Sequence, residues 1–271
     1  MMRSLWTAAS GMIAQQTNVD TISNNLANVN TTGFKSEKAE FKSLLYQTIQ
    51  ARTTTANGEQ KPIPAQVGLG TRVAATTSSY TDGALLANDS DTAFALQGDG
   101  FFAVRGADGN TYYTRNGDFN WSMGTTGVTL TNSDGYPVLD TNGNAIVLPN
   151  NVTTGSVEVS KEGTFSYKDA NGNHIPLNVT IGVWQFNNPA GLNKRADNLL
   201  QVTAASGNPM NEATTNGLAK SSVNQHYLEG SNVQIADEMV NLIVAQRAYE
   251  MNSKAIQASD DMLSQANQLR R

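Results

Sequence analysis

Apolar residues recur at helical spacing near the start of the chain. Between Ser4 and Val29 there is no proline and a single glycine, and apolar side chains alternate steps of three and four residues. This heptad pattern predicts a helix that buries one narrow stripe. Ser4 is expected to cap this helix, and Gly33 is expected to end it. The stripe consists of Leu5, Ala8, Met12, Gln15, Val19, Ile22, Leu26 and Val29.

The C-terminal zone repeats the pattern over a longer stretch. Ser231 is expected to be the N-cap, because Gln234 completes an S-x-x-Q capping box. The apolar residues of this zone form a series with members seven residues apart. A second series, four residues further on, begins at Met239 and becomes polar. The sequence therefore predicts one helix of about 55 Å, at 1.5 Å per residue. The apolar series, with members seven residues apart, consists of Ile235, Leu242, Tyr249, Ile256 and Leu263.

The middle of the chain has a different character. Lys35–Ser79 is polar and threonine-rich, and we interpret it as an extended linker with one short helical turn at residues 40–47. From Tyr80 to about Asn224, pairs such as Asp134-Gly135 recur between strand-like runs. Because Asp-Gly and Asn-Gly supply the positive φ of tight hairpin turns, this zone is predicted to be an antiparallel all-β domain.

These patterns predict an α+β fold. Long N- and C-terminal helices pair as a coiled coil, and a central antiparallel all-β domain is inserted between them. The two helices form one discontinuous helical domain. The predicted borders are 1–34 for the N-terminal helix, 35–79 for the linker, 80–228 for the all-β domain and 229–271 for the C-terminal helix.

Composition narrows the classes of function. Charged residues make up 15% of the 271 residues, against about 25% in ordinary globular chains. The net charge of −5 argues against a general nucleic-acid binder, which carries a basic surface. Cysteine is absent and there are two histidines, which excludes disulfides and thiolate chemistry and makes a multi-histidine metal site untenable. No run of 18 apolar residues predicts a membrane-spanning helix.

The N-terminus gives an expectation about export. It lacks the apolar region and the cleavage pattern of a standard signal peptide. The protein is therefore expected either to stay in the cytoplasm or to leave it by a route that keeps the N-terminus intact.

Motifs that suggest chemistry do not have the context that they need. The run GDGFFA at residues 98–103 matches the glycine pattern of dinucleotide-binding loops, but a strand-like FFAVR follows where a helix is required. Asp140-x-Asn142-x-Asn144 and Asp169-x-Asn171-x-Asn173 resemble the start of calcium loops without the glycine at position six. We interpret all three as hairpin turns. No catalytic residue, metal, cofactor or small-molecule ligand is expected.

Several blocks resemble one family of proteins. SNNLANVNTTGFK, at Ser23–Lys35, closely resembles the N-terminal signature of bacterial flagellar rod and hook proteins, and Glu229–Leu263 is similar to their C-terminal signature. GDGFFAV (98–104), YTRNGDF (113–119) and LTNSDGYPVLD (130–140) look like the central blocks of that family. The N-terminal signature residues are Ser23, Asn25, Leu26, Ala27, Asn28, Thr31, Gly33, Phe34 and Lys35.

The resemblance implies a non-enzymatic structural subunit of the flagellar basal body. Length, block order and the segment Tyr46–Pro64 look most like the distal rod, and the proximal rod and hook subunits are near alternatives. Such subunits leave the cell through the flagellar export apparatus without a cleaved signal peptide. They polymerise into a hollow, periplasm-spanning drive shaft that lines the export channel. The implied partners are copies of the same chain, the proximal rod, the hook and the basal-body rings.

The terminal helices are expected to form seams between subunits, because two long helices with narrow stripes bury little on their own. Leu242 is therefore predicted to be exposed in the free monomer. Asn25 and Asn28 have two interpretations, a fraying helix end or side-chain hydrogen bonds that fix subunit register. The predicted seam residues are Leu5, Met12, Val19, Ile22, Leu26 and Val29 in the N-terminal helix and Ile235, Met239, Leu242, Tyr249, Ile256 and Leu263 in the C-terminal helix.

Two interpretations from other classes remain open. One is a secreted β-rich adhesin or glycan-binding module with helical oligomerisation ends, and the other is a carbohydrate-active enzyme. Electron microscopy of concentrated protein distinguishes the axial protein from the adhesin: tubes or rods favour the former, and discrete monomers that bind glycans favour the latter.

Overall fold

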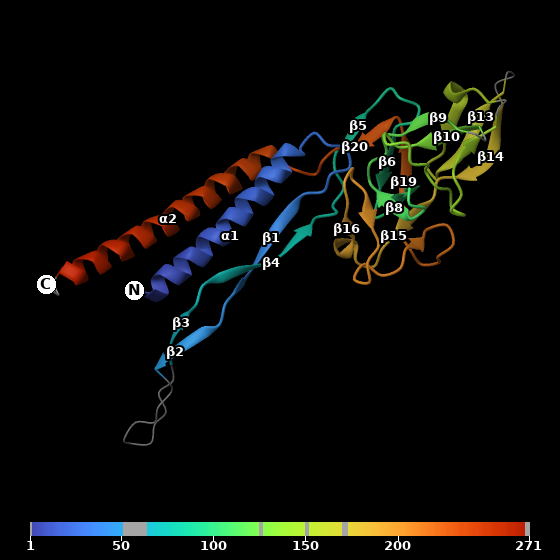
Figure 1. Ribbon diagram of the computed structural model, residues 1–271. Coiled ribbons are helices and arrows are strands. Elements are labelled where there is room, and N and C mark those ends of the chain that lie inside the picture. Colours follow the sequence, from blue (N-terminus) through green and yellow to red (C-terminus); the bar gives the residue numbers. More distant parts are fainter. Residues whose placement is uncertain (1, 51–63, 125–126, 150–151, 170–172, 269–271) are drawn as a thin grey trace. The chain divides into compact units, whose positions relative to one another are not determined.

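The computed structural model describes residues 2–50, 64–124, 127–149, 152–169 and 173–268, and it is drawn in Figure 1. Within these residues the chain forms two compact units. The helical unit takes in Met1–Ala27, Glu37–Ser78 and Gln234–Arg271, and the sheet unit takes in Asn28–Ser36 and Ser79–Val233. Neither of the helices that the structure describes is long and apolar enough to cross a membrane.

The helical unit contains two long helices that lie side by side (Figure 1). They run antiparallel, since the Ser4 hydroxyl lies 3.2 Å from the Ser259 hydroxyl at one end of the pair. At the other end, Asn25 Nδ2 donates to Glu238 Oε1 at 3.1 Å. At 1.5 Å per residue the helices are about 39 Å and about 51 Å long. They are α1 (Met2–Ala27) and α2 (Ile235–Gln268).

The predicted helix caps differ from those observed. α1 begins two residues before Ser4, so Ser4 is not its N-cap. Ser231 is not the N-cap of α2 either, because its hydroxyl accepts from the Val233 amide at 3.3 Å and α2 begins at Ile235. Acidic residues occupy the first turn of α2, where the helix dipole stabilises negative charge.

Residues 35–79, predicted to be an extended linker, instead contain four strands. β1 pairs with β4 and β2 pairs with β3, both antiparallel, and the expected helical turn at 40–47 lies in β1 and β2. The ribbon packs along α1, where the Ser10 hydroxyl accepts from the Thr71 amide at 3.3 Å. Threonine and valine suit such a ribbon, since β-branched side chains fit a pleated surface. The strands are β1 (Glu37–Ser43), β2 (Tyr46–Gln50), β3 (Ala65–Gly68) and β4 (Thr71–Ser78). Residues 51–63 of the segment Tyr46–Pro64 lie outside the described residues.

The sheet unit is antiparallel throughout the strand pairs that the structure describes, which confirms the predicted β-rich middle. Its largest sheet has the order β16-β17-β8-β7-β15-β18, and smaller sheets are β11-β10-β9, β12-β13-β14, β19-β6 and β20-β5. Short 3₁₀ turns lie at Thr154–Ser156 and Pro189–Gly191. The strands are β5 (Leu85–Ala87), β6 (Phe94–Gln97), β7 (Phe101–Arg105), β8 (Thr111–Thr114), β9 (Asn120–Gly124), β10 (Gly127–Thr131), β11 (Val147–Leu148), β12 (Val157–Val159), β13 (Thr164–Lys168), β14 (His174–Thr180), β15 (Val183–Gln185), β16 (Asn193–Lys194), β17 (Leu200–Gln201), β18 (Met210–Asn211), β19 (Ser222–Gln225) and β20 (Tyr227–Glu229).

Strand β7 divides the core of the sheet unit into two clusters. Because successive side chains of a strand point to opposite faces, Phe102 lies in one apolar cluster and Phe101 in the other. Phe102 packs edge-to-face on Phe119 with ring centroids 5.2 Å apart. On the other face, Phe101 packs edge-to-face on Phe186 with centroids 5.7 Å apart. The run FFAVR is therefore a central strand buried on both faces, as its apolar sequence indicates.

The hairpin turns use the predicted chemistry. Gly143 has a φ of 81°, the left-handed region that Asn-Gly turns require. In the same turn the amides of Asn142 and Asn144 both donate to Asp140 Oδ1 at 2.8 Å, so this calcium-like motif is a hydrogen-bonded turn. Asn171 of the second such motif lies outside the described residues. The GDGFFA motif leads into strand β7 rather than a helix, as expected.

A buried tyrosine gives the sheet unit a measurable dependence on alkaline pH. Burial raises the pKa of Tyr113 from 10.0 to about 12. The folded protein thus holds the phenol proton more tightly than the unfolded chain does. The free energy of unfolding is therefore expected to lose a contribution as the pH rises from about 10 to about 12. Tyr113→Phe removes that contribution, and denaturation curves of both proteins measured across this range check it. Equal pH slopes for the two proteins would contradict the assignment.

Candidate assembly surface and buried charge cluster

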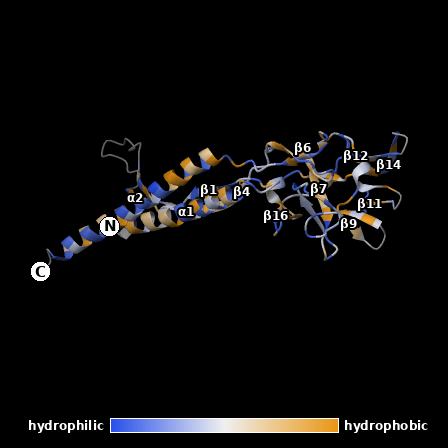
Figure 2. Cartoon of the chain, turned by 90° about the horizontal axis from the view of Figure 1, so that it is seen from above, coloured by the Kyte–Doolittle hydropathy of each residue, from blue (hydrophilic) through white to orange (hydrophobic). Residues whose placement is uncertain are grey.

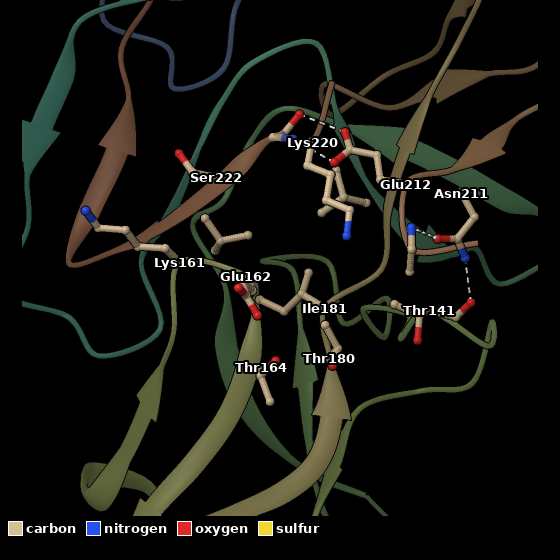
Figure 3. A pocket seen from close by; sticks show the side chains of 14 residues that line it. Thr141, Lys161, Glu162, Thr164, Thr180, Ile181, Asn211, Glu212, Lys220 and Ser222 are labelled. Carbon is tan, nitrogen blue, oxygen red and sulfur yellow. Dashed lines mark hydrogen bonds between the residues drawn. The ribbon is translucent and has the colours of Figure 1, made fainter. Parts of the chain in front are cut away.

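The sheet unit contains a cavity of about 550 Å³ with a mixed polar and apolar lining, shown in Figure 3. Glu212 on its wall accepts from the Ser221 amide and hydroxyl, both at 2.7 Å, and from Gln185 Nε2 at 2.8 Å. The Ser221 hydroxyl also accepts from the Gly100 amide at 3.0 Å. Both groups thus hold chain segments together. Among the described residues, no three His, Asp or Glu side chains are placed to hold a metal ion.

The predicted seam residues of α1 lie mainly toward the inside of the helical unit. Ile22 is buried, and the others are half-buried. The face of α1 toward α2 is marked by Gly11, where an added Cβ would lie 2.9 Å from Asn252 Nδ2. This close approach shows how tightly the two helices pack. Val29 follows the end of α1 and belongs to the sheet unit. The half-buried members are Leu5, Met12, Val19, Leu26 and Val29.

The predicted seam of α2 divides between two faces. Leu242, Ile256 and Leu263 are half-buried, whereas Ile235, Met239 and Tyr249 are exposed. The face toward α1 is marked by Ala245 and Ser259, both buried. These lie three residues after members of the seven-residue series, not four. The available signal was two small residues fourteen apart, Ala245 and Ser259, outside the heptad series.

A second apolar face of α2 points away from α1. Its residues are spaced so that they fall on one side of the helix, opposite Ala245, and each is at least half exposed. We call this face the outer stripe. α1 adds Trp6 and Ile13, exposed to 73% and 66% and seven residues apart. Figure 2 shows hydrophobic residues along both helices. The outer stripe consists of Val240, Ile243, Val244, Met251 and Met262.

Asn25 of the N-terminal signature is a buried hydrogen-bond hub. Its Nδ2 donates to the Glu37 carbonyl at 2.8 Å and to Glu238 Oε1 at 3.1 Å. Its Oδ1 accepts from the Glu37 amide at 2.9 Å. The side chain therefore ties α1 to both β1 and α2 inside one chain, and α1 does not fray at this point. Asn28 lies in the turn after α1, where its Oδ1 accepts from the Thr31 hydroxyl at 3.1 Å.

A charge cluster of Lys35, Asp82, Arg115 and Glu229 lies inside the sheet unit. Glu229 is 1% exposed, and its Oε1 accepts from Lys35 Nζ at 2.6 Å. Its Oε2 lies 3.3 Å from Arg115 Nη1, which also lies 3.4 Å from Asp82 Oδ1. Burial lowers the pKa of Lys35, and the Glu229 carboxylate partly opposes that shift. Lys35, Arg115 and Glu229 are buried, whereas Asp82 is 40% exposed. Because an unpaired buried charge is costly, removing one of the three buried members is expected to destabilise the sheet unit.

The charge cluster is extended by contacts with the backbone and with an aromatic ring. Glu229 Oε1 also accepts from the Gly83 amide at 3.0 Å, and the Glu229 carbonyl accepts from the Gly33 amide at 2.8 Å. The Arg115 guanidinium lies 5.1 Å from the centre of the Phe101 ring, within the range of a cation–π interaction.

Comparison with known protein families covers three stretches of the chain. Residues 5–35 match "Flagella basal body rod protein", residues 95–167 match "Flagellar hook protein FlgE/F/G D1 domain", and residues 224–269 match "Flagellar basal body rod FlgEFG protein C-terminal". The chain is 46% identical to the flagellar basal-body rod protein FlgG of Borreliella burgdorferi, over all of both chains. The chain belongs to the flagellar basal-body rod and hook protein family.

Two further relatives support this membership over the whole chain. The flagellar basal-body rod protein FlgG of Caulobacter vibrioides is 41% identical over 99% of this chain and all of its own. The flagellar hook-basal body complex protein FlhP of Bacillus subtilis is 31% identical over the full length of both. This is a family of structural rod proteins, and the resemblance found in the sequence is confirmed.

Each of the three family-matched stretches supplies one member of the charge cluster. Lys35 is the last residue of the first stretch, Arg115 lies in the second and Glu229 lies in the third. All three lie within the signature blocks of the sequence, but only Lys35 was among the predicted signature residues. Lys35 is the single charged residue of its block, whereas nothing in the other two blocks marks Arg115 or Glu229.

Proposed function

We propose that this chain is a structural subunit of the flagellar distal rod. Its full-length similarity to basal-body rod proteins named FlgG is the observation that carries the proposal. Copies of the chain polymerise into a hollow shaft that transmits torque to the hook. A shaft of this kind needs repeated head-to-tail contacts, which generate an open helical polymer rather than a closed ring. The chain performs no catalysis in this role.

The outer stripe of α2 is the surface that supports polymerisation best. Its five apolar side chains are uncovered in the single chain, and burying one such side chain is worth about 1.5–3 kcal/mol. A second copy of this chain is the occupant, because a polymer repeats the same contact at every subunit. Trp6 and Ile13 of α1 add a second exposed apolar surface for neighbouring copies. The predicted seam residues that face inward, such as Ile22 and Leu242, pair α1 with α2 as a coiled coil.

The remaining assignments follow from the place of a distal rod subunit. The subunit reaches the periplasm through the flagellar export apparatus with its N-terminus intact. There it meets the proximal rod below, the hook above and the basal-body rings around it. Proximal rod and hook subunits of the same family are the alternative roles.

Polymerisation of the purified chain tests this proposal. Negative-stain electron microscopy of concentrated protein is expected to show rods or tubes. Expression in a motile bacterium that lacks its own distal rod subunit is expected to restore rod assembly. Discrete monomers at high concentration, together with hooks that form normally without this chain, would contradict the proposed role.

A further inference from the structure

The sheet unit is joined to the helical unit by four chain crossings. They lie between residues 27 and 28, 36 and 37, 78 and 79, and 233 and 234. In a torque-transmitting subunit, any force that enters the sheet unit along the chain passes through these crossings. The contacts made by the residues on the sheet-unit side of each crossing therefore decide whether such a force unfolds part of the unit.

Hydrogen bonds join the chain segments at the second, third and fourth crossings, directly on the sheet-unit side. The Ser79 amide donates to the Ser36 carbonyl at 2.8 Å. The Ser36 amide donates to Asn232 Oδ1 at 2.7 Å, and Asn232 Nδ2 donates back to the Ser79 carbonyl at 2.9 Å. These bonds form a closed ring among segments that are far apart in the sequence.

The charge cluster links the same segments to the largest sheet. Lys35 Nζ donates to Glu229 at 2.6 Å and to the Thr81 carbonyl at 2.8 Å, which joins the second, third and fourth crossing segments. Residues 28–36, which connect the first crossing to the second, are held again where the Gly33 amide donates to the Glu229 carbonyl at 2.8 Å. Arg115, directly after β8, carries the connection into the six-stranded sheet.

We propose that the Ser36–Ser79–Asn232 ring and the charge cluster act together as a clamp that keeps force at the crossings from unfolding the sheet unit. The inference rests on the proposed function, because it assumes a subunit under torque. The chemistry suits the task, since hydrogen bonds and buried ion pairs fix one geometry, whereas apolar contacts are non-directional. Glu229, which precedes the fourth crossing, is the centre of the clamp because its side chain and carbonyl contact both the segment between the first and second crossings and the segment after the third.

Glu229→Gln is the variant that tests the clamp, since it keeps the shape of the side chain and removes its charge. The matched control is Glu158→Gln, which breaks the ion pair of Glu158 with Lys168 on the surface of the same unit. Hydrogen exchange of the full-length chain is measured at the amides of Gly33 and Gly83, which donate to Glu229, and at the amide of Phe102 in the core.

The expected result is selective. In Glu229→Gln the amides of Gly33 and Gly83 exchange about 100-fold faster, because the buried cations Lys35 and Arg115 lose their carboxylate partner. Exchange at the amide of Phe102 changes less than threefold. Glu158→Gln leaves all three unchanged. Unchanged exchange at Gly33 and Gly83 in Glu229→Gln, or equal acceleration in the control, overturns the clamp.

A double variant covers the case in which Glu229→Gln does not fold. Lys35→Met with Glu229→Leu removes one charge of each sign and leaves Arg115 with Asp82 as its partner, and such replacements often preserve folding. The clamp predicts that this variant folds but still exchanges faster at Gly33 and Gly83. Parental protection at both amides, or failure of this variant to fold as well, overturns the proposal, because the cluster would then serve the fold as a whole.

Motility under load supplies the functional measurement. Cells that assemble rods from Glu229→Gln subunits are expected to swim normally in dilute medium and to lose speed more steeply than parental cells as viscosity rises. The same viscosity dependence as in parental cells overturns the clamp. If the unchanged chain builds no rods, the proposed function fails instead, and the exchange measurement on the monomer still judges the clamp by itself.

Discussion

Replacing Val244 with aspartate is expected to abolish polymer formation and leave the free monomer intact. Val244 is 62% exposed in the centre of the outer stripe, so the monomer loses little, and its melting temperature shifts by less than about 2 °C. In the polymer the variant loses apolar burial and buries a carboxylate without a partner, which together cost more than about 4 kcal/mol per contact. The concentration needed for polymerisation should rise about a thousandfold. Sedimentation and electron microscopy measure this.

Two control variants separate charge from position. Gln257→Asp places the same charge on an exposed part of α2 outside the outer stripe, and it should polymerise like the parent. Leu242→Asp places the charge on the half-buried face toward α1, and it should lower the melting temperature of the monomer. A monomer that tolerates Leu242→Asp but is unfolded by Val244→Asp would show that the two faces have been assigned the wrong way round.

Phe102→Ala is expected to be the most damaging single substitution in the sheet unit. Phe102 is fully buried on the central strand β7 and packs on Phe119. Truncating a buried phenylalanine to alanine costs about 3–5 kcal/mol, through lost burial and the cavity that remains. For a unit of this size that corresponds to a drop in melting temperature of about 6–20 °C. Calorimetry or denaturant unfolding of the full chain measures the change.

Met123→Ala is the control for this substitution. Met123 lies in the same unit on β9 and is 87% exposed, so its truncation should change the free energy of unfolding by less than about 0.5 kcal/mol. Equal losses in the two variants would mean that Phe102 is not part of a packed core.

The sequence predicted the elements that depend on local chemistry. Turn pairs such as Asn142-Gly143 indicated hairpins because their conformational demands act within four residues. The long helices were equally readable, since their periodicity extends over many turns. The ribbon β1–β4 was missed because its strands bury little and pack along α1, so no alternation of apolar and polar residues marks them.

The charge cluster and the outer stripe were beyond sequence reasoning for another reason. Lys35, Arg115 and Glu229 are brought together by the fold, and nothing local to any of them indicates its partners. For α2, heptad spacing located an apolar series but did not decide which neighbouring face meets α1. That choice depends on how closely α1 approaches at Gly11, which is a property of the assembled pair of helices.

The pairing of strands from opposite ends of the sheet unit has a consequence for how a subunit matures. β20 pairs with β5 and β19 pairs with β6, while the helical unit needs both α1 and α2. Neither unit can therefore be completed by a fragment of the chain, whichever end emerges first from a narrow conduit. Contacts of such long sequence separation form slowly, because the intervening loop must close before they are gained. A subunit in transit thus stays unfinished until nearly its whole length has been delivered, so final folding is confined to the place where the chain arrives.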